Sequence, residues 1–156
     1  MLRRNRNCTS DYVEVFQARG SSYDLAMRNY PTARDEEFQQ LVRRASPKPG
    51  DCLADIPAGG GYLKRHLPDS CHWLGHEPCT AFGVPATTHH NAPAHFLPLP
   101  WSKETIDIAV SLAGVHHLDD KRPLFKEIFQ VVRPGGKFVL SDVLEGSAVA
   151  HFLDDF

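Results

Sequence analysis

The sequence lacks the features of a nucleic-acid-binding surface, a membrane span or an exported chain. Its 17 basic and 19 acidic residues give a formal net charge of −2, whereas nucleic-acid binders concentrate positive charge on one face. No apolar run approaches the roughly 20 residues that cross a bilayer, and the first residues include no apolar stretch typical of a signal peptide. We therefore expect a cytoplasmic protein that binds neither nucleic acid nor membrane.

Cysteine is scarce, and no two cysteines are spaced as a CxxC pair. One short segment does gather four potential metal ligands, namely Cys71, His72, His76 and Cys79. Their spacing matches no common structural zinc pattern. We therefore predict no metal site, and thiols that are buried or idle in a reducing compartment.

Segments with apolar residues at helical spacing alternate along the chain with segments at strand spacing. One helix is predicted over 32–45 and another from Asp119 or Asp120 to about Val132, with a short helix over 62–67. Strands are predicted at 51–56, 71–75, 105–113 and 137–143, and a further one near 95–97. Residues 1–20 show little periodicity, and we expect them to be poorly ordered. Strands that alternate with helices indicate parallel βαβ units in one domain over 21–156.

The segment Leu53–Gly61 predicts a ligand-binding loop. A strand, a glycine turn and a helix N-terminus would place backbone N–H groups around a ligand. Glycines allow the main chain to approach closely because they have no Cβ. Glu77 follows the next strand, where a carboxylate can accept hydrogen bonds from two ribose hydroxyls. This arrangement suits a cofactor that contains adenosine.

The residues around the loop discriminate between cofactors. Gly59 and Gly61 fit the dinucleotide fingerprint GxGxxG, but Lys64 occupies the third glycine position. Asp55 precedes the turn, where it can meet the positively charged amino group of a methionine moiety. A pyrophosphate would be repelled by that carboxylate, so the pattern favours an amino-acid-bearing nucleoside.

Four segments in order resemble the class I S-adenosylmethionine-dependent methyltransferases, especially the small-molecule type 11 group. Asp55-x-Pro57-x-Gly59-x-Gly61 resembles the D/E-x-G-x-G-x-G loop of that family, and Glu77 matches its acidic ribose position. The other three segments resemble its LPF…FDxVxS, LHHL and LRPGG stretches, at 99–111, 115–118 and 132–138.

The resemblance implies a Rossmann-like, mostly parallel α/β sheet flanked by helices, with an N-terminal helical lid over 21–46 that carries Tyr23, Tyr30 and Arg34. The cofactor is expected to be S-adenosylmethionine, bound by Asp55, Pro57, Ala58, Gly59, Gly61, Glu77 and Pro78. His116 and His117 are the candidate catalytic residues, because they follow a strand whose carboxyl end should line the ligand crevice and histidine acts as a general base. Asp142 is a further candidate.

The sequence departs from the family pattern in three places. Pro57 replaces the first glycine of the loop. The stretch between Glu77 and Leu99 is short, which leaves His95 and Phe96 as candidate adenine contacts. The chain stops soon after residues 137–143, where the family continues with a helix and an antiparallel strand pair. We therefore expect either a truncated form that lacks this pair or a partner chain that covers the exposed edge of strand 137–143, and we hypothesise a homo-oligomer through that edge.

The expected function is methyl transfer from S-adenosylmethionine to a small-molecule acceptor. Two alternatives stay open. A non-catalytic module that binds S-adenosylmethionine or serves assembly would bind the cofactor without turnover. An NAD-dependent oxidoreductase on a related fold would bind NAD and would not respond to S-adenosylhomocysteine.

Overall fold

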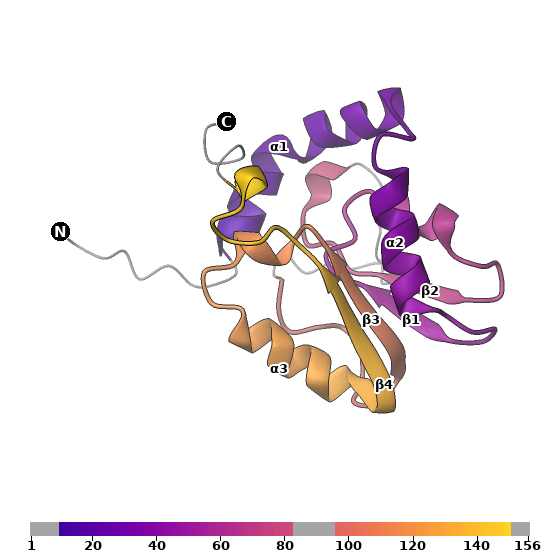
Figure 1. The fold of residues 1–156 in the computed structure, drawn as a ribbon. Coiled ribbons are helices and arrows are strands. Elements are labelled where there is room, and N and C mark those ends of the chain that lie inside the picture. The colour runs from indigo at the N-terminus through magenta and orange to yellow at the C-terminus, as the bar shows by residue number, and fades with distance from the viewer. Residues whose placement is uncertain (1–9, 83–95, 151–156) are drawn as a thin grey trace.

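A four-stranded parallel sheet forms the centre of the protein (Figure 1). The computed structural model describes residues 10–82 and 96–150. The strands are β1 (Cys52–Asp55), β2 (His72–Gly75), β3 (Ile106–Leu112) and β4 (Val132–Ser141). They lie in the order β2-β1-β3-β4, and each neighbouring pair is parallel. All four strands therefore end at the same edge of the sheet.

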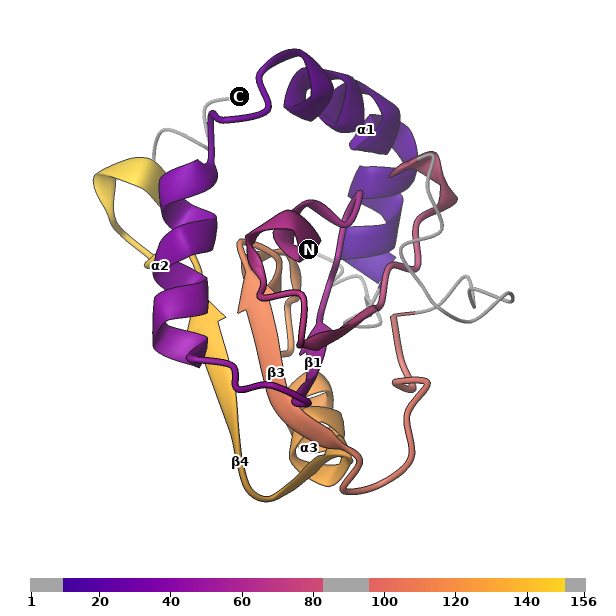
Figure 2. The same cartoon turned by 90° about the vertical axis from the view of Figure 1, so that its right-hand side faces the viewer.

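Helices cover both faces of the sheet and one of its ends. They are α1 (Ser10–Asn29), α2 (Asp35–Ala45) and α3 (Arg122–Val131), with short 3-10 turns η1 (Tyr62–His66), η2 (Thr80–Phe82) and η3 (Val115–His117). Figure 2 shows α2 on one side of the sheet and α3 on the other, with α1 near the end at which the strands finish. This is the Rossmann-like α/β architecture predicted above. No helix of the described residues is long and apolar enough to cross a membrane.

The best-predicted elements are those with the clearest local patterns. Helix α2 has three acidic residues in its first turn and two arginines in its last, which suits the helix dipole. Its buried residues Phe38, Leu41 and Ala45 pack with Leu53 and Ile108 of the sheet. Strand β3 is buried along almost its whole length, as expected for a parallel strand covered on both faces.

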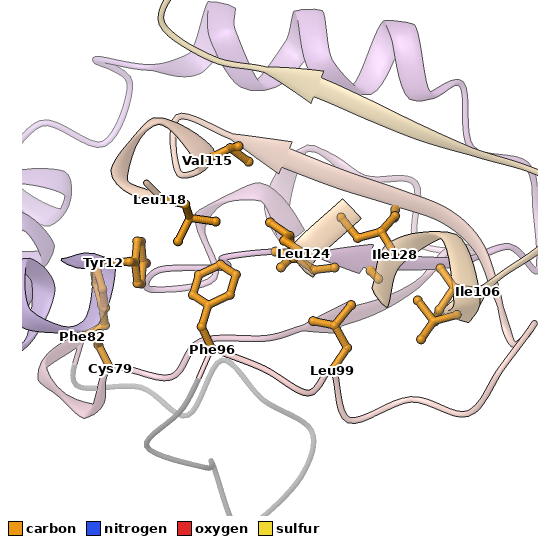
Figure 3. Close-up of a cluster of buried hydrophobic side chains, with 14 residues drawn as sticks. Tyr12, Cys79, Phe82, Phe96, Leu99, Ile106, Val115, Leu118, Leu124 and Ile128 are labelled. Atoms are coloured by element: carbon orange, nitrogen blue, oxygen red, sulfur yellow. The ribbon is translucent and has the colours of Figure 1, made fainter. Parts of the chain in front are cut away.

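A second apolar cluster fills the opposite face of the sheet and extends to α1 (Figure 3). Leu124 and Ile128 of α3 contribute to it, and so does Phe96, whose side chain is fully buried. The ring centroid of Tyr12 in α1 lies 5.1 Å from that of Phe96. Helix α1 is therefore joined to the central core.

The start of the first helix differs from the sequence prediction. Residues 10–20, expected to be poorly ordered, form the first half of α1, which continues to Asn29. The physical reason is an apolar face at helical spacing, formed by Tyr12, Phe16, Tyr23 and Met27. This face packs against η2 and the core.

The strand expected near 95–97 is not observed at residues 96–97, and His95 lies outside the described residues. Pro98 and Pro100 follow Phe96 and have no backbone N–H to donate to a sheet ladder. Phe96 instead enters the core as a buried side chain. Strand β2 is therefore an edge strand of the sheet in the part of the chain that the structure describes.

Strand β4 begins five residues earlier than predicted, at Val132. Ile106 is paired with Val132 and Ile108 with Lys137, so Arg133–Gly136 form a bulge in the strand. Gly135 has a φ of 81°, which glycine tolerates without steric cost. Strand β4 is the opposite edge strand of the sheet. The side chain of Leu140 in this strand is 43% exposed. Homo-oligomer formation through residues 137–143 stays a prediction.

Candidate functional site

The loop after β1 crosses the edge at which the strands end. Ile56 N–H donates to the carbonyl of Val110 at 3.0 Å, which fastens the loop to β3. Ala58 N–H donates to the carbonyl of His76 at 2.9 Å, which fastens it to the segment after β2. The loop therefore spans three adjacent strand ends and is held on both sides.

Close packing explains the glycines of the loop. Gly59 and Gly61 have φ values of 53° and 77°, a region that disfavours other residues. A Cβ at Gly60 would lie 2.6 Å from ring atoms of Tyr62. The backbone conformation therefore favours glycine at positions 59 and 61, and a side chain at position 60 would require the Tyr62 ring to move.

Glu77 is a buried carboxylate directly beside this loop. Its side chain accepts hydrogen bonds from the Gly59 and Cys79 N–H groups at 2.9 and 2.8 Å. The Tyr12 hydroxyl of α1 donates a third, at 2.7 Å. Burial raises the pKa of Glu77, and these hydrogen bonds counteract only part of that rise. Pro78 is also buried beside Glu77.

Asp55 is the second buried carboxylate, and it ends β1 next to β2. The indole N–H of Trp73 donates to it at 3.2 Å. Burial raises the pKa of Asp55 to about 7, and the negative charge of Glu77 adds to the rise. The two acids named from the sequence therefore lie at adjacent strand ends, close enough to influence each other's ionisation.

The segment after β3 packs directly on the glycine loop. A Cβ at Gly114 would lie 2.4 Å from Cδ and 2.5 Å from Cγ of Pro57. Pro57, which replaces a family glycine, therefore faces a glycine on the neighbouring segment. This contact brings η3, with His116 and His117, to the same edge as Asp55.

The two histidines have different surroundings. His116 Nδ1 lies 2.6 Å from Oδ1 of Asp142, which follows β4. The His117 ring packs against Phe16 and Tyr12 of α1, with centroid distances of 5.0 and 6.1 Å. Burial, followed by the charge of His116, lowers the pKa of His117 to about 4.

Of the three lid residues named from the sequence, Tyr23 and Arg34 are in contact and Tyr30 is not part of that contact. A guanidinium N–H of Arg34 donates to the Tyr23 hydroxyl, and the ring of Tyr23 lies 6.1 Å from that of Tyr62 in η1. Tyr30 is 69% exposed and takes no part in this cluster. The candidate adenine contact Phe96 packs in the core, and His95 lies outside the described residues.

Sequence reasoning missed two residues at the site. Tyr12 lies in the stretch expected to be poorly ordered, although its helical spacing with Phe16 was a usable signal. Trp73 donates its indole N–H to Asp55, and no local sequence pattern indicates this contact. In residues 10–82 and 96–150, no three His, Cys, Asp or Glu side chains are placed to hold a metal ion.

Comparison with known proteins places this site in a family. The family model described as "Methyltransferase domain" matches residues 55–140, more than half of the chain. The match begins at Asp55 and includes the glycine loop, Glu77 and both histidines. The chain belongs to this methyltransferase family.

Individual relatives agree with that assignment. A demethylmenaquinone methyltransferase of Corynebacterium kroppenstedtii is 28% identical over 85% of this chain and 59% of its own length. A malonyl-[acyl-carrier protein] O-methyltransferase of Hahella chejuensis is 27% identical over 92% of this chain and 53% of its own. The chain thus spans less than two thirds of the length of either relative.

A solved structure supports the fold. The crystal structure of a SAM-dependent methyltransferase from Thermotoga maritima superposes with a TM-score of 0.67 at 17% identity. The similarity covers 91% of this chain and 67% of that one. At 17% identity this similarity shows the shared fold alone, that is, the arrangement of the sheet and its helices.

Proposed function

We propose that this chain binds S-adenosylmethionine across the carboxyl ends of β1 and β2 and transfers its methyl group to a small-molecule acceptor. The observation that supports the proposal is the pair of buried carboxylates, Asp55 and Glu77. Each is 4% exposed, and burial raises the pKa of both. A cationic ligand would relieve this unfavourable concentration of negative charge.

Each part of the site has a role in this proposal. Glu77 binds the ribose hydroxyls, with its carboxylate oriented by the Gly59 and Cys79 N–H groups. Asp55 attracts the amino group of the methionine moiety. The remaining family positions, Pro57, Ala58, Gly59, Gly61 and Pro78, line the same ligand. When bound, the cofactor supplies an electrophilic methyl group on a sulfonium.

The same electrostatics argue against a dinucleotide. A pyrophosphate would carry further negative charge to the two carboxylates, and like charges in a buried site repel strongly. The side chain at the third fingerprint position, Lys64, lies over the ring of Trp73 at 5.6 Å. It is therefore engaged on the protein surface beside Asp55.

The acceptor is proposed to be a small molecule. The formal net charge of −2 provides no excess of basic residues for a nucleic acid. The relatives described above act, by name, on demethylmenaquinone and on a malonyl group carried by a protein. These acceptors differ widely, so the choice of acceptor depends on residues beyond the cofactor site.

Thermal unfolding tests the proposal directly. S-adenosylhomocysteine at 100 times its Kd should stabilise the folded state by about 2.7 kcal/mol, which raises the Tm by roughly 5–10 °C for a chain of this size. NAD at the same concentration should leave the Tm unchanged. A shift with NAD and none with S-adenosylhomocysteine would instead indicate an oxidoreductase. A shift without transfer of labelled methyl groups to any acceptor would indicate a non-catalytic module.

Binding should also release protons near neutral pH. Asp55 has a pKa of about 7 in the folded protein, so about half of the molecules hold this proton at pH 7. The ammonium group of the ligand lowers that pKa, and up to half a proton per site leaves. Calorimetry in buffers of different ionisation enthalpy measures this release. Equal heats in all buffers would contradict a cation beside Asp55.

Asp55→Asn serves as the control for this experiment. The folded pKa lies above the unfolded value of 3.8, so the folded state holds a proton that the unfolded chain has lost. The free energy of unfolding therefore falls as the pH rises from about 4 to 7 through this group. The variant should lose both this decline and the proton release.

A further inference from the structure

A histidine–carboxylate pair lies where β3 and β4 end. His116 Nδ1 and Asp142 Oδ1 are 2.6 Å apart, with side chains 27% and 11% exposed. Asp142 also accepts hydrogen bonds from the N–H groups of Val115, His116 and Val143 at 2.7, 3.1 and 2.7 Å. Four hydrogen bonds therefore fix the carboxylate, and the carboxylate fixes the imidazole.

The geometry defines the tautomer of His116. Burial tends to raise the pKa of Asp142, but the hydrogen bonds from His116, Val143 and Val115 outweigh it and lower the pKa. Asp142 is therefore ionised at neutral pH, and an ionised carboxylate only accepts hydrogen bonds. The proton of a neutral His116 must lie on Nδ1, which leaves Nε2 as the basic nitrogen.

His117 is not suited to the same task. Its ring is packed against α1, and its pKa of about 4 makes it a weak base. It also has no carboxylate hydrogen bonded to it among the described contacts, whereas His116 has Asp142. The structure thus separates two neighbouring histidines that the sequence could not distinguish.

The position of the pair relative to the cofactor site follows from the strand order β2-β1-β3-β4. In the proposed function, the ribose lies at Glu77 after β2 and the amino group at Asp55 after β1. The pair lies on the next two strands, and Gly114 joins its segment to the loop at Pro57. His116 therefore lies at the strand ends next to Asp55, with its side chain 27% exposed and its ring centroid 3.9 Å from that of His117.

We propose that His116, positioned by Asp142, is the general base for an acceptor with a weakly acidic hydroxyl, such as a phenol or hydroquinone. This inference rests on the proposed function. Nε2 takes the hydroxyl proton, and the resulting oxyanion, or the ring carbon that it activates, bonds to the methyl carbon. The carbon–sulfur bond breaks, and its electron pair stays on sulfur, so that a neutral thioether leaves. A carbon acceptor then releases its ring proton to water, which restores aromaticity.

A base serves an acceptor whose reacting group carries a proton at neutral pH, and a weakly acidic hydroxyl is one such group. A carboxylate or an unprotonated tertiary amine is already nucleophilic at neutral pH and needs no proton removed. A phenolic hydroxyl has a pKa near 10, as in tyrosine, and is almost fully protonated at pH 7. A positioned base raises the rate for such an acceptor by a factor of about 10²–10⁴.

Methyl transfer to 1,4-dihydroxynaphthalene, kept reduced, tests the proposal. We expect the wild type to methylate it from labelled S-adenosylmethionine. His116→Gln and Asp142→Asn should lower kcat at least about 100-fold, while affinity for S-adenosylhomocysteine changes less than about threefold. Asp119→Asn makes the same chemical change at an exposed residue and should match the wild type. Unchanged kcat in Asp142→Asn would overturn the role of the pair.

Two further outcomes separate this inference from the proposed function. A wild-type chain that binds S-adenosylhomocysteine but does not methylate the probe would overturn the acceptor class alone. A chain that does not bind it would overturn the proposed function as well. Independently of turnover, two-bond ¹H–¹⁵N spectra should show the His116 proton on Nδ1 in the wild type and a shift toward Nε2 in Asp142→Asn. A wild-type proton on Nε2 would contradict the pair.

Discussion

Replacement of Glu77 by glutamine is expected to weaken binding of S-adenosylhomocysteine by about 10- to 150-fold. A hydrogen bond to a charged group contributes about 1.5–3 kcal/mol, and the amide retains one acceptor where the carboxylate has two. The Gly59, Cys79 and Tyr12 donors already converge on this side chain. The amide NH₂ of the glutamine would therefore face one of these donors, and one hydrogen bond to the ribose would be lost. Isothermal titration measures the change in affinity.

The expected effect of Glu77→Gln on stability is much smaller. The substitution removes one hydrogen-bond acceptor, which destabilises the fold, but it also removes a buried charge whose pKa is already raised. These contributions have opposite signs. Glu104→Gln, at an exposed residue far along the chain, is the matched control and should bind like the wild type. Affinity within about fivefold of the wild type would show that Glu77 does not hold the ribose.

Gly114→Ala is expected to lower the free energy of unfolding by about 3 kcal/mol, the upper part of the range for overpacked sites. The new Cβ would lie 2.4 Å from Cδ of Pro57, so either the loop or the segment after β3 must move. The backbone at Gly114 has a φ of −126°, which any residue adopts, and the cost is therefore steric. Thermal unfolding should show a Tm lower by roughly 6–12 °C, together with weaker binding of S-adenosylhomocysteine.

A double-mutant cycle isolates this contact. Pro57→Ala removes the two ring atoms that the new methyl group would strike, so the double variant should lose less stability than the sum of the single variants. Gly135→Ala is the comparison for backbone strain alone, because its φ is 81° and no atom lies within 4 Å of the added Cβ. It should cost only about 1–2 kcal/mol. If the changes in the free energy of unfolding were strictly additive, the clash between the new methyl group and Pro57 would be absent.

The sequence predicted the elements whose stability is set by local pattern. Helix α2 and strand β3 were placed within a few residues because their apolar patterns are clear and, for α2, the charges at both helix ends agree with the pattern. The glycine loop and the positions of Asp55 and Glu77 followed from the strand–turn–helix pattern, since parallel strands end at one edge. The strand predicted near 95–97 is not observed at residues 96–97, because Pro98 and Pro100 follow directly and proline cannot donate to a ladder.

The contacts that give the site its chemistry join residues far apart in the sequence. Tyr12 and Glu77 are separated by 65 positions, and His116 and Asp142 by 26. No local pattern contains these pairings, because they depend on how α1 docks and on how β4 aligns with β3. The bulge at Arg133–Gly136 determines that alignment, and with it the place where Asp142 emerges.

The hydrogen bond from Tyr12 to Glu77 joins the first helix to the residue that is proposed to bind the ribose. A ribose hydroxyl that reaches the same carboxylate oxygen must share it with Tyr12 or displace it, since Gly59 already donates there as well. In the proposed function, docking of the helix and binding of the ligand are therefore thermodynamically linked, and each changes the equilibrium of the other by the same factor. The docking equilibrium of the amino-terminal helix would then change when the ligand binds.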